Sequence, residues 1–243
     1  MSRKFSLGVL AVGLLAAGSA QAYQAGDFIV RTGAVTVDPN ESSDHVGLAG
    51  TGLADEGWEV GVDSDTQLGL SGTWMMTDSF GLSLLAATPF QHNLYGSGSL
   101  PRAADLGSTK HLPPTLTLQY YPLHSSHRIQ PYVGVGVNYT IFFEEKTSDT
   151  LTGAVDNYVT GGAGGAVSST DMDLDDSVGI AAEIGVDIKL DDRFGINVGV
   201  WYADIDTTAD INAYDVNGTR LGTAKVDVEI DPMVYMVGFT YSF

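Results

Sequence analysis

The feature that most constrains this chain is a regular alternation of apolar and other residues, which recurs along most of its length. It is clearest at residues 177–190, where seven apolar side chains at the even positions, from Val178 to Leu190, interleave with polar, charged and small residues. A period of two places successive side chains on opposite faces of a β-strand. Glycine accounts for 30 of the 243 residues, well above the usual roughly 7 per cent, and this density disfavours helices. The chain is therefore expected to be all-β.

Eight such segments are separated by connections that alternate between short and long. The connections at 77–79, 122–128 and 191–193 are short, whereas those at 39–65, 91–111 and 146–176 are long. This asymmetry is typical of an outer-membrane barrel with short periplasmic turns and long extracellular loops. The even number of strands would place both chain ends on the periplasmic side. The expected strands are approximately 27–38, 66–77, 80–90, 112–121, 129–145, 177–190, 194–209 and 224–243.

The less apolar face of these segments carries residues that a soluble β-sandwich would have to bury. An aqueous or hydrogen-bonded lumen suits them better, which favours an eight-stranded antiparallel transmembrane β-barrel. The ending Gly238-x-x-Tyr241-x-Phe243 resembles the signal that the barrel-assembly machinery reads, so that machinery is an expected partner during biogenesis. The predicted lumen residues are Arg31, Gln67, Gln119, Asn138, Glu183, Asp187, Lys189 and Asn197.

The amino-terminal residues predict export. Arg3 and Lys4 precede an apolar stretch from 7 to 17 and the small-residue pattern Ala20-Gln21-Ala22, which is the form of a secretory signal peptide. We therefore expect a signal peptide at 1–22 and a barrel at 23–243. The formal net charge of −19 argues against nucleic acid as a partner, and the absence of cysteine excludes thiolate metal sites and thiol chemistry.

The parity of the first, seventh and eighth segments predicts an apolar upper lumen. When their alternation is followed toward the extracellular end, acidic residues continue the lipid-facing side and aliphatic residues continue the inner side. The outer acidic residues are Asp204, Asp206, Asp227, Glu229 and Asp231. The inner residues are Val35, Val37, Ile205, Val226, Val228 and Ile230. Asp63, Asp65 and Asp175 fall on the inward parity of other strands, where a β-bulge would be needed to turn them outward.

Two bulky inward residues and three prolines are the remaining candidate features of a channel. Leu85 and Trp201 stand at similar heights among small and polar neighbours, so they are predicted to form a constriction; the alternative is that they simply fill a narrow barrel. Pro89, Pro113 and Pro114 cannot donate to a β-ladder. We expect them to leave a lateral opening, the alternative being that they end a loop above the membrane.

Several motifs together resemble the OmpW/AlkL family of outer-membrane proteins. They are Leu84–Phe90, Lys110–Leu116, Gln130–Thr140, Trp201–Thr208 and Asp231-Pro232, which are spread over most of the chain. The resemblance implies an eight-stranded barrel with a hydrophobic channel, associated with passage of small hydrophobic molecules across the outer membrane. The loops depart from the family pattern, particularly the glycine-rich stretch at 157–173, so no external ligand is inferred from it.

Enzymatic and metal-binding alternatives receive less support from the residues. Of the five histidines, His92 and His111 bound the second long loop and could approach each other, but no serine or carboxylate stands beside them at a recognisable spacing. His124 and His127 lie in a short turn and His45 in a loop. Residues 171–176 lack the glycine and glutamate of an EF-hand, which leaves only a loose divalent-cation site or a solvated acidic loop. Residues 161–165 are expected to form a loop tip and not a phosphate cradle.

The function predicted from the sequence is passive uptake of small hydrophobic compounds, without a cofactor. Lipopolysaccharide resists apolar solutes, and an apolar funnel above the bilayer offers them a favourable path. The expected partners are small hydrophobic molecules, outer-membrane lipid and lipopolysaccharide. One alternative is a structural or receptor barrel with a packed interior, and a less favoured one is a lipid-modifying enzyme.

Overall fold

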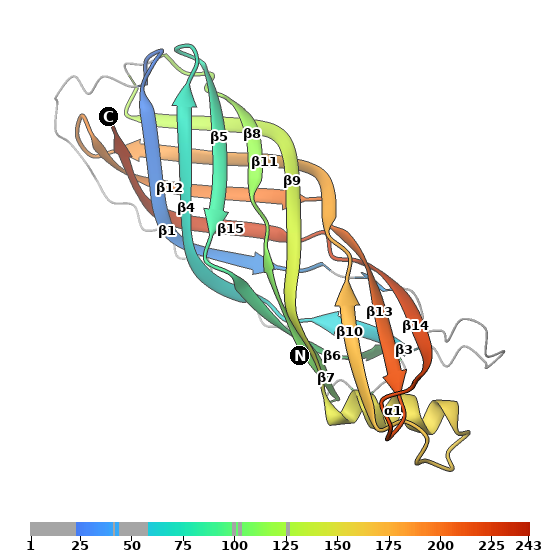
Figure 1. Cartoon of the computed structure of the whole chain (residues 1–243). Helices are drawn as coiled ribbons and strands as arrows, with labels where there is room; N and C mark the ends of the chain where they lie inside the picture. Colours follow the sequence, from blue (N-terminus) through green and yellow to red (C-terminus); the bar gives the residue numbers. More distant parts are fainter. Residues whose placement is uncertain (1–22, 41, 44–57, 99–100, 102–103, 125–126) are drawn as a thin grey trace.

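The computed structural model describes residues 23–40, 42–43, 58–98, 101, 104–124 and 127–243. The expected signal peptide at 1–22 and His45 lie outside these residues. Within them, the chain forms a closed antiparallel barrel with a β-rich extension at one end (Figure 1).

Eight strands make the barrel, which confirms the predicted fold. The sheet closes on itself because its two ends are joined by pairing of residues 177–188 with 129–140. Its chain ends also meet, since the first and last strands pair from Ile29 with Ser242 to Asp38 with Met233. In their order around the barrel the strands are β1 (Phe28–Asp38), β4 (Asp65–Met75), β5 (Phe80–Ala87), β8 (Thr115–Tyr120), β9 (Ile129–Thr147), β11 (Ser177–Lys189), β12 (Phe194–Ala203) and β15 (Met233–Ser242).

The extension stands on the end of the barrel opposite the short connections. We call the two ends the loop end and the turn end; the loop end is drawn at the lower right of Figure 1. Three strands continue from β9 as β7-β6-β3, and four others form the separate sheet β10-β13-β14-β2. The elements of the extension are β2 (Ser42–Ser43), β3 (Trp58–Val62), β6 (Phe90–Gly98), β7 (Asp105–Leu112), α1 (Asp149–Val159), β10 (Ser169–Leu174), β13 (Asp206–Tyr214) and β14 (Arg220–Glu229).

Several predicted segments are broken where they leave the barrel. The segment 194–209 divides after Ala203, and 224–243 divides between Glu229 and Met233. At the second break Asp231 has a φ of 38° and is followed by Pro232, which has no N–H for the ladder. The segment 80–90 is likewise interrupted before Pro89. The breaks after Ala203 and Glu229 separate β13 and β14 from the barrel wall and place them in a second sheet, whereas the break before Pro89 leads into β6, which pairs with β7.

The structure also contains a helix, and the expectation that none would form was wrong. Ser148 caps α1, because its Oγ accepts a hydrogen bond from the Leu151 N–H at 3.0 Å. Leu151 and Val155, one turn apart, supply the buried face. One glycine, Gly153, lies within the helix, and the run of glycines at 161–165 comes just after it, where Gly161 and Gly162 have positive φ. Among the described residues, no helix is long and apolar enough to cross a bilayer.

The outer wall of the barrel is apolar, as the alternation predicted. Large side chains on it are strongly exposed, including Leu68 at 62%, Val135 at 67% and Phe239 at 68%. Toward the turn end the wall carries aromatic side chains. The rings of Phe80 and Tyr120 have centroids 5.1 Å apart, and those of Phe194 and Tyr241 have centroids 4.9 Å apart. An apolar band with aromatic residues at its border is the surface of a barrel that sits in lipid.

Candidate functional site

The extension encloses an apolar cavity, which we call the upper cavity. It contains about 1250 Å³ of space not filled by atoms, part of it open to solvent. Among the side chains that line it, the exceptions to apolar character are two threonines, Thr109 and Thr207, the hydroxyl of Tyr158 and the histidines His92 and His111. The wall therefore offers a favourable environment to an apolar solute and few groups that bind a polar one.

Five of the six residues predicted for the apolar upper lumen line this cavity. They come from β1, β14 and the two strand breaks, and the sixth residue, Val35, lies closer to the turn end in a smaller pocket. Of the five acidic residues predicted to face outward, Asp206, Asp227 and Glu229 are exposed, whereas Asp204 and Asp231, at the strand breaks, are half-buried. The five residues in the upper cavity are Val37, Ile205, Val226, Val228 and Ile230.

The rest of the wall comes from elements that the sequence did not assign to the site. Leu94 and Leu106 extend from β6 and β7, Leu151 and Val155 from α1, and Met172 from β10. These residues form one buried cluster. The spacing of Leu151 and Val155 was a detectable helical signal, whereas Leu94 and Leu106 are isolated among polar and small residues and carried no periodic signal.

The inward parity of Asp63 and Asp65 has an explanation other than the bulge proposed from the sequence. Asp65 Oδ2 accepts a hydrogen bond from the Gln91 N–H at 2.9 Å, and Asp63 Oδ1 accepts one from the Asn93 N–H at 2.7 Å. The two carboxylates thus satisfy backbone donors of β6 at the place where β4 and β3 separate. Asp175 contributes its main-chain carbonyl, which accepts from Thr207 Oγ1 at 2.7 Å.

A group of three carboxylates lies at the junction of barrel and extension. Oxygen atoms of Asp204, Asp206 and Asp231 all lie within 4.8 Å of one another. Among the described residues, the three carboxylates that come close together are these, and not those of the segment 171–176 that the sequence suggested. Asp171 and Asp173 belong to β10, where Asp171 accepts a hydrogen bond from Tyr214.

Replacing Asp206 with asparagine is expected to change the stability by less than about 0.5 kcal/mol, as is usual for an exposed site. The pKa of Asp206 is raised by burial and by the negative charges of Asp204, Asp231 and Glu229. A raised pKa makes ionisation slightly unfavourable in the folded state, so this cost is absent below the unfolded-state pKa and appears as the pH rises through the folded-state pKa. Urea unfolding of Asp206→Asn and of the unmodified protein should therefore show that the variant loses slightly less stability between acid and neutral pH. Destabilisation by several kcal/mol would place this side chain inside the barrel.

A second, smaller pocket lies between the upper cavity and the middle of the barrel. We call it the lower pocket. Leu85 and Trp201, the residues predicted to form a constriction, both line it and belong to one buried cluster with Val35 and Val234. Their side chains are 8% and 3% exposed. The structure therefore brings the two residues into the same layer of the lumen, directly below the upper cavity.

The lower pocket adjoins an interruption in the barrel ladder. Pairing of β5 with β8 ends at Leu85 with Thr115, and pairing of β6 with β7 begins at Phe90 with His111. Ala87 and Pro113 would face each other in the continued register, yet no backbone hydrogen bond joins them among the described residues. Ala86, Ala87 and Pro113 also line the lower pocket. The prolines predicted to open the wall thus lie in the interrupted segments.

The two adjacent prolines face different neighbours. The Pro114 carbonyl accepts a hydrogen bond from the Tyr139 N–H of β9 at 3.0 Å, so residue 114 presents its backbone to β9. The Pro113 carbonyl accepts hydrogen bonds from the side chains of Thr115 at 3.1 Å and of Asn138, in β9, at 3.2 Å. Residue 113 faces Ala87 of β5 in the continued register. It is Pro113 that lacks the donor which would continue the ladder with β5.

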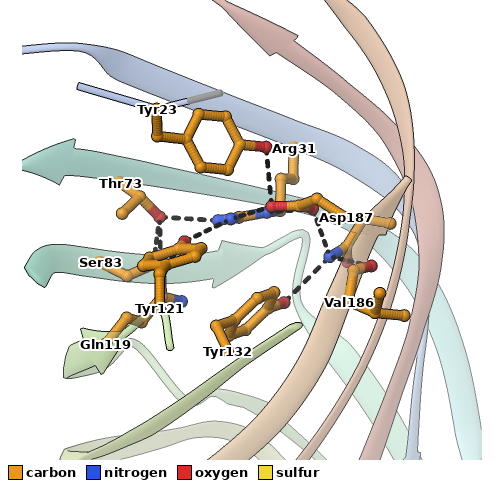
Figure 2. A network of polar contacts seen from close by, with 10 residues as sticks. Tyr23, Arg31, Thr73, Ser83, Gln119, Tyr121, Tyr132, Val186 and Asp187 are labelled. Atoms are coloured by element: carbon orange, nitrogen blue, oxygen red, sulfur yellow. Dashed lines mark hydrogen bonds and ion pairs between the residues drawn. The ribbon is translucent and has the colours of Figure 1, made fainter. Parts of the chain in front are cut away.

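Toward the turn end, the lumen is closed by a polar network (Figure 2). Arg31 donates to both carboxylate oxygens of Asp187, at 3.0 Å from Nε and 2.6 Å from Nη2. The guanidinium also donates to Thr73 at 2.7 Å and to Tyr121 at 2.8 Å. The side chains of Arg31 and Asp187 are 1% and 0% exposed. Further bonds from Tyr23 and Asn197 reach Asp187, so the pair closes the axis of the barrel with a hydrogen-bonded layer.

The two histidines that bound the second long loop do approach each other. Their Nε2 atoms are 2.9 Å apart, and both rings are buried. His92 has its second contact with the main-chain carbonyl of Asp63, and among the described residues no serine hydroxyl bonds to either ring. Within the described residues the pair therefore does not form the Ser–His arrangement of a catalytic triad.

Comparison with known proteins identifies relatives over almost the whole chain. A model of the OmpW family matches residues 24–243. Outer membrane protein W of Vibrio cholerae serotype O1 is 41% identical over 237 residues, which cover 97% of each chain. The crystal structure of the outer membrane protein OprG from Pseudomonas aeruginosa is 43% identical, has a TM-score of 0.77 and covers 92% of this chain and 98% of that chain. A more distant relative is the dibenzothiophene metabolism operon protein PahQ of Pseudomonas aeruginosa, 26% identical over 70% of this chain and 68% of its own.

These matches agree with the architecture. The structure has a closed eight-stranded barrel, an apolar outer wall and a strand extension beyond it. The family match extends over both the barrel and the extension, and it confirms the resemblance found in the sequence motifs. The chain belongs to the OmpW family and is an outer-membrane β-barrel.

Proposed function

We propose that this protein is a passive channel through which small hydrophobic compounds pass from outside the cell into the outer membrane. The observation that carries the proposal is the upper cavity, whose wall is almost entirely apolar and partly open to solvent. An apolar solute gains roughly 25 cal/mol for each Å² of its surface that leaves water. The name of PahQ refers to the metabolism of dibenzothiophene, an apolar aromatic compound, and this supports the solute class.

The polar network toward the turn end favours a sideways exit. An apolar solute that moved along the axis would have to displace the hydrogen bonds of Arg31 and Asp187, whose partners are all buried, and unpaired buried charges are very costly. The interruption between Ala87 and Pro113 lies above this layer and beside the lower pocket. The proposed path therefore runs from the upper cavity past Leu85 and Trp201 and out through the wall into lipid.

Filling the upper cavity is expected to slow uptake. Ala224 lies in its wall and is 3% exposed, whereas the next residue, Lys225, points outward. Ala224→Phe should reduce the uptake of naphthalene into vesicles roughly tenfold, equivalent to about 1.4 kcal/mol, because the ring occupies space that the solute needs. Lys225→Phe introduces the same ring outside the cavity and should leave uptake unchanged.

The vesicle assay also tests the solute class. Vesicles with the unmodified protein should take up naphthalene faster than protein-free vesicles, but should show no gain for glucose. Equal acceleration of both solutes, or normal naphthalene uptake by Ala224→Phe, would contradict the proposal.

A structural or receptor role is the second candidate, and the packed lower lumen is the observation that favours it. In that case the upper cavity would not be a route, and none of the variants above would change the uptake of any solute. The relatives compared above are named as membrane or operon proteins, not as enzymes, so a lipid-modifying activity has no comparable support.

A further inference from the structure

His111 occupies the junction between the two apolar compartments. It is the titratable side chain that lines both the upper cavity and the lower pocket, together with the apolar Val37 and Ile205. The residue is 4% exposed. Its ring lies 5.9 Å from that of Phe142, nearly parallel to it, and 5.4 Å from that of Phe90. A solute on the proposed path must therefore pass a polar ring set in an apolar wall.

The hydrogen bonds of the histidine pair determine which nitrogens carry protons. The Asp63 carbonyl can only accept, so His92 Nδ1 carries a hydrogen and donates it. In a neutral ring His92 Nε2 is then an acceptor, and the hydrogen between the two rings belongs to His111 Nε2. His111 Nδ1 is left with a bare lone pair. This atom is buried and has no hydrogen-bond partner among the described residues.

The electrostatic surroundings keep this acceptor available. Burial and the neighbouring His92 lower the pKa of His111 to about 3, and Asp65 opposes this only in part. The ring is therefore neutral at ordinary pH, and its free nitrogen accepts hydrogen bonds instead of donating them. A buried acceptor without a partner carries a desolvation cost that a donor on a ligand would remove.

We propose that His111 Nδ1 accepts a hydrogen bond from a passing solute, so that the site prefers small apolar molecules with a single hydroxyl over isomers without a donor. The substrate class would be aliphatic alcohols and phenols whose remaining surface is apolar. This inference rests on the proposed function, because it assigns a specificity to the same path. One added neutral hydrogen bond of about 1 kcal/mol corresponds to roughly fivefold tighter binding.

The test uses two isomers, 1-hexanol and methyl pentyl ether, which differ in having or lacking a donor. Protein with ¹⁵N-labelled histidine in lipid nanodiscs would be titrated with each, at a pH where both rings are neutral. The free protein should show His111 as the Nε2–H tautomer. Hexanol should shift the His111 Nδ1 resonance toward the hydrogen-bonded range and bind about fivefold more tightly than the ether, which should leave that resonance in place.

Two variants locate the effect. His111→Phe keeps a ring between Phe90 and Phe142 but removes the acceptor, so it should bind both isomers with equal affinity. Thr109→Val removes a hydroxyl from the same wall that already donates to the Lys110 carbonyl, and it should retain the preference for hexanol. Should His111→Phe fail to fold, the titration of the unmodified protein with the two isomers still tests whether His111 Nδ1 accepts a hydrogen bond from the solute.

The outcomes separate this inference from the proposed function. Equal binding of both isomers to the unmodified protein, without a shift at Nδ1, overturns the role of His111 and leaves the channel standing. Binding of neither isomer overturns the channel as well. A preference that persists in His111→Phe also contradicts the assignment, because the acceptor would then lie elsewhere.

Discussion

Pro113→Val is expected to slow the uptake of a hydrophobic solute about fivefold or more, because it supplies the donor that the ladder lacks. Valine has an N–H that can bond to the Ala87 carbonyl, which faces residue 113 in the continued register. One restored bond of about 1 kcal/mol lowers the population of an open gap about fivefold. The effect would be larger in lipid, where each unsatisfied backbone group costs several kcal/mol.

Pro114→Val is the matched control for this experiment. It makes the same chemical change one residue later, but residue 114 faces β9 and its carbonyl already accepts from Tyr139. Uptake of naphthalene should therefore be nearly unchanged. Both variants should fold, as judged by migration on a gel before and after boiling. Equal rates for Pro113→Val and the unmodified protein would leave the lateral exit without support.

Trp201→Ala distinguishes a sideways exit from an axial one. The substitution enlarges the lower pocket but leaves the Arg31 network in place. If solute leaves through the wall, this variant should change uptake far less than Pro113→Val does. A strong acceleration would instead show that passage along the axis past Trp201 limits the rate.

Asp187→Asn is expected to destabilise the barrel by about 3–5 kcal/mol, the usual cost of removing one partner from a buried ion pair. Arg31 would keep its charge in a layer where its side chain is 1% exposed. Three side chains donate four hydrogen bonds to Asp187, namely Tyr23, Arg31 through two nitrogens, and Asn197, and all of them would lose a charged acceptor. Urea unfolding in lipid vesicles measures the difference.

The double variant Arg31→Met/Asp187→Leu is the control for this result. It removes both charges together, and such replacements of a buried pair are often close to neutral. It should therefore be more stable than Asp187→Asn, although Thr73 and Tyr121 lose a partner. If the single variant were as stable as the unmodified protein, the ion pair would not be a stabilising element of the lumen.

Alternation predicted which way side chains point, because that property is local to a strand. Val226 and Val228 lie in the upper cavity, while Asp227 between them is exposed. The breaks at 204–205 and 230–232 escaped prediction since they preserve the phase, and inward positions continue from Val228 through Ile230 to Val234. A pattern of period two cannot register an interruption across which inward residues stay on the same parity.

Contacts across the lumen and between loops could not be predicted from the sequence. Arg31 and Asp187 were each predicted to face inward, but their pairing joins residues 156 positions apart on strands that are not neighbours. The helix α1 escaped prediction because glycine content describes the whole chain, whereas the cap Ser148 and the pair Leu151 and Val155 are local helical signals. The meeting of His92 and His111 was foreseen only as a possibility, since it depends on how β6 pairs with β7.

We expect the ion pair of the lumen also to favour the correct strand register during folding. A strand that slides by two residues keeps every side chain on its proper face, so alternation alone does not reject it. Such a slip would move Asp187 about 6.6 Å along the barrel, beyond hydrogen-bonding reach of Arg31, and would leave a buried guanidinium uncompensated. The uncompensated charge arises in the mispaired barrel, because in the native barrel Asp187 accepts from Arg31. β1 and β11, which are separated in the wall by β15 and β12, are thereby held in a single register by two side chains.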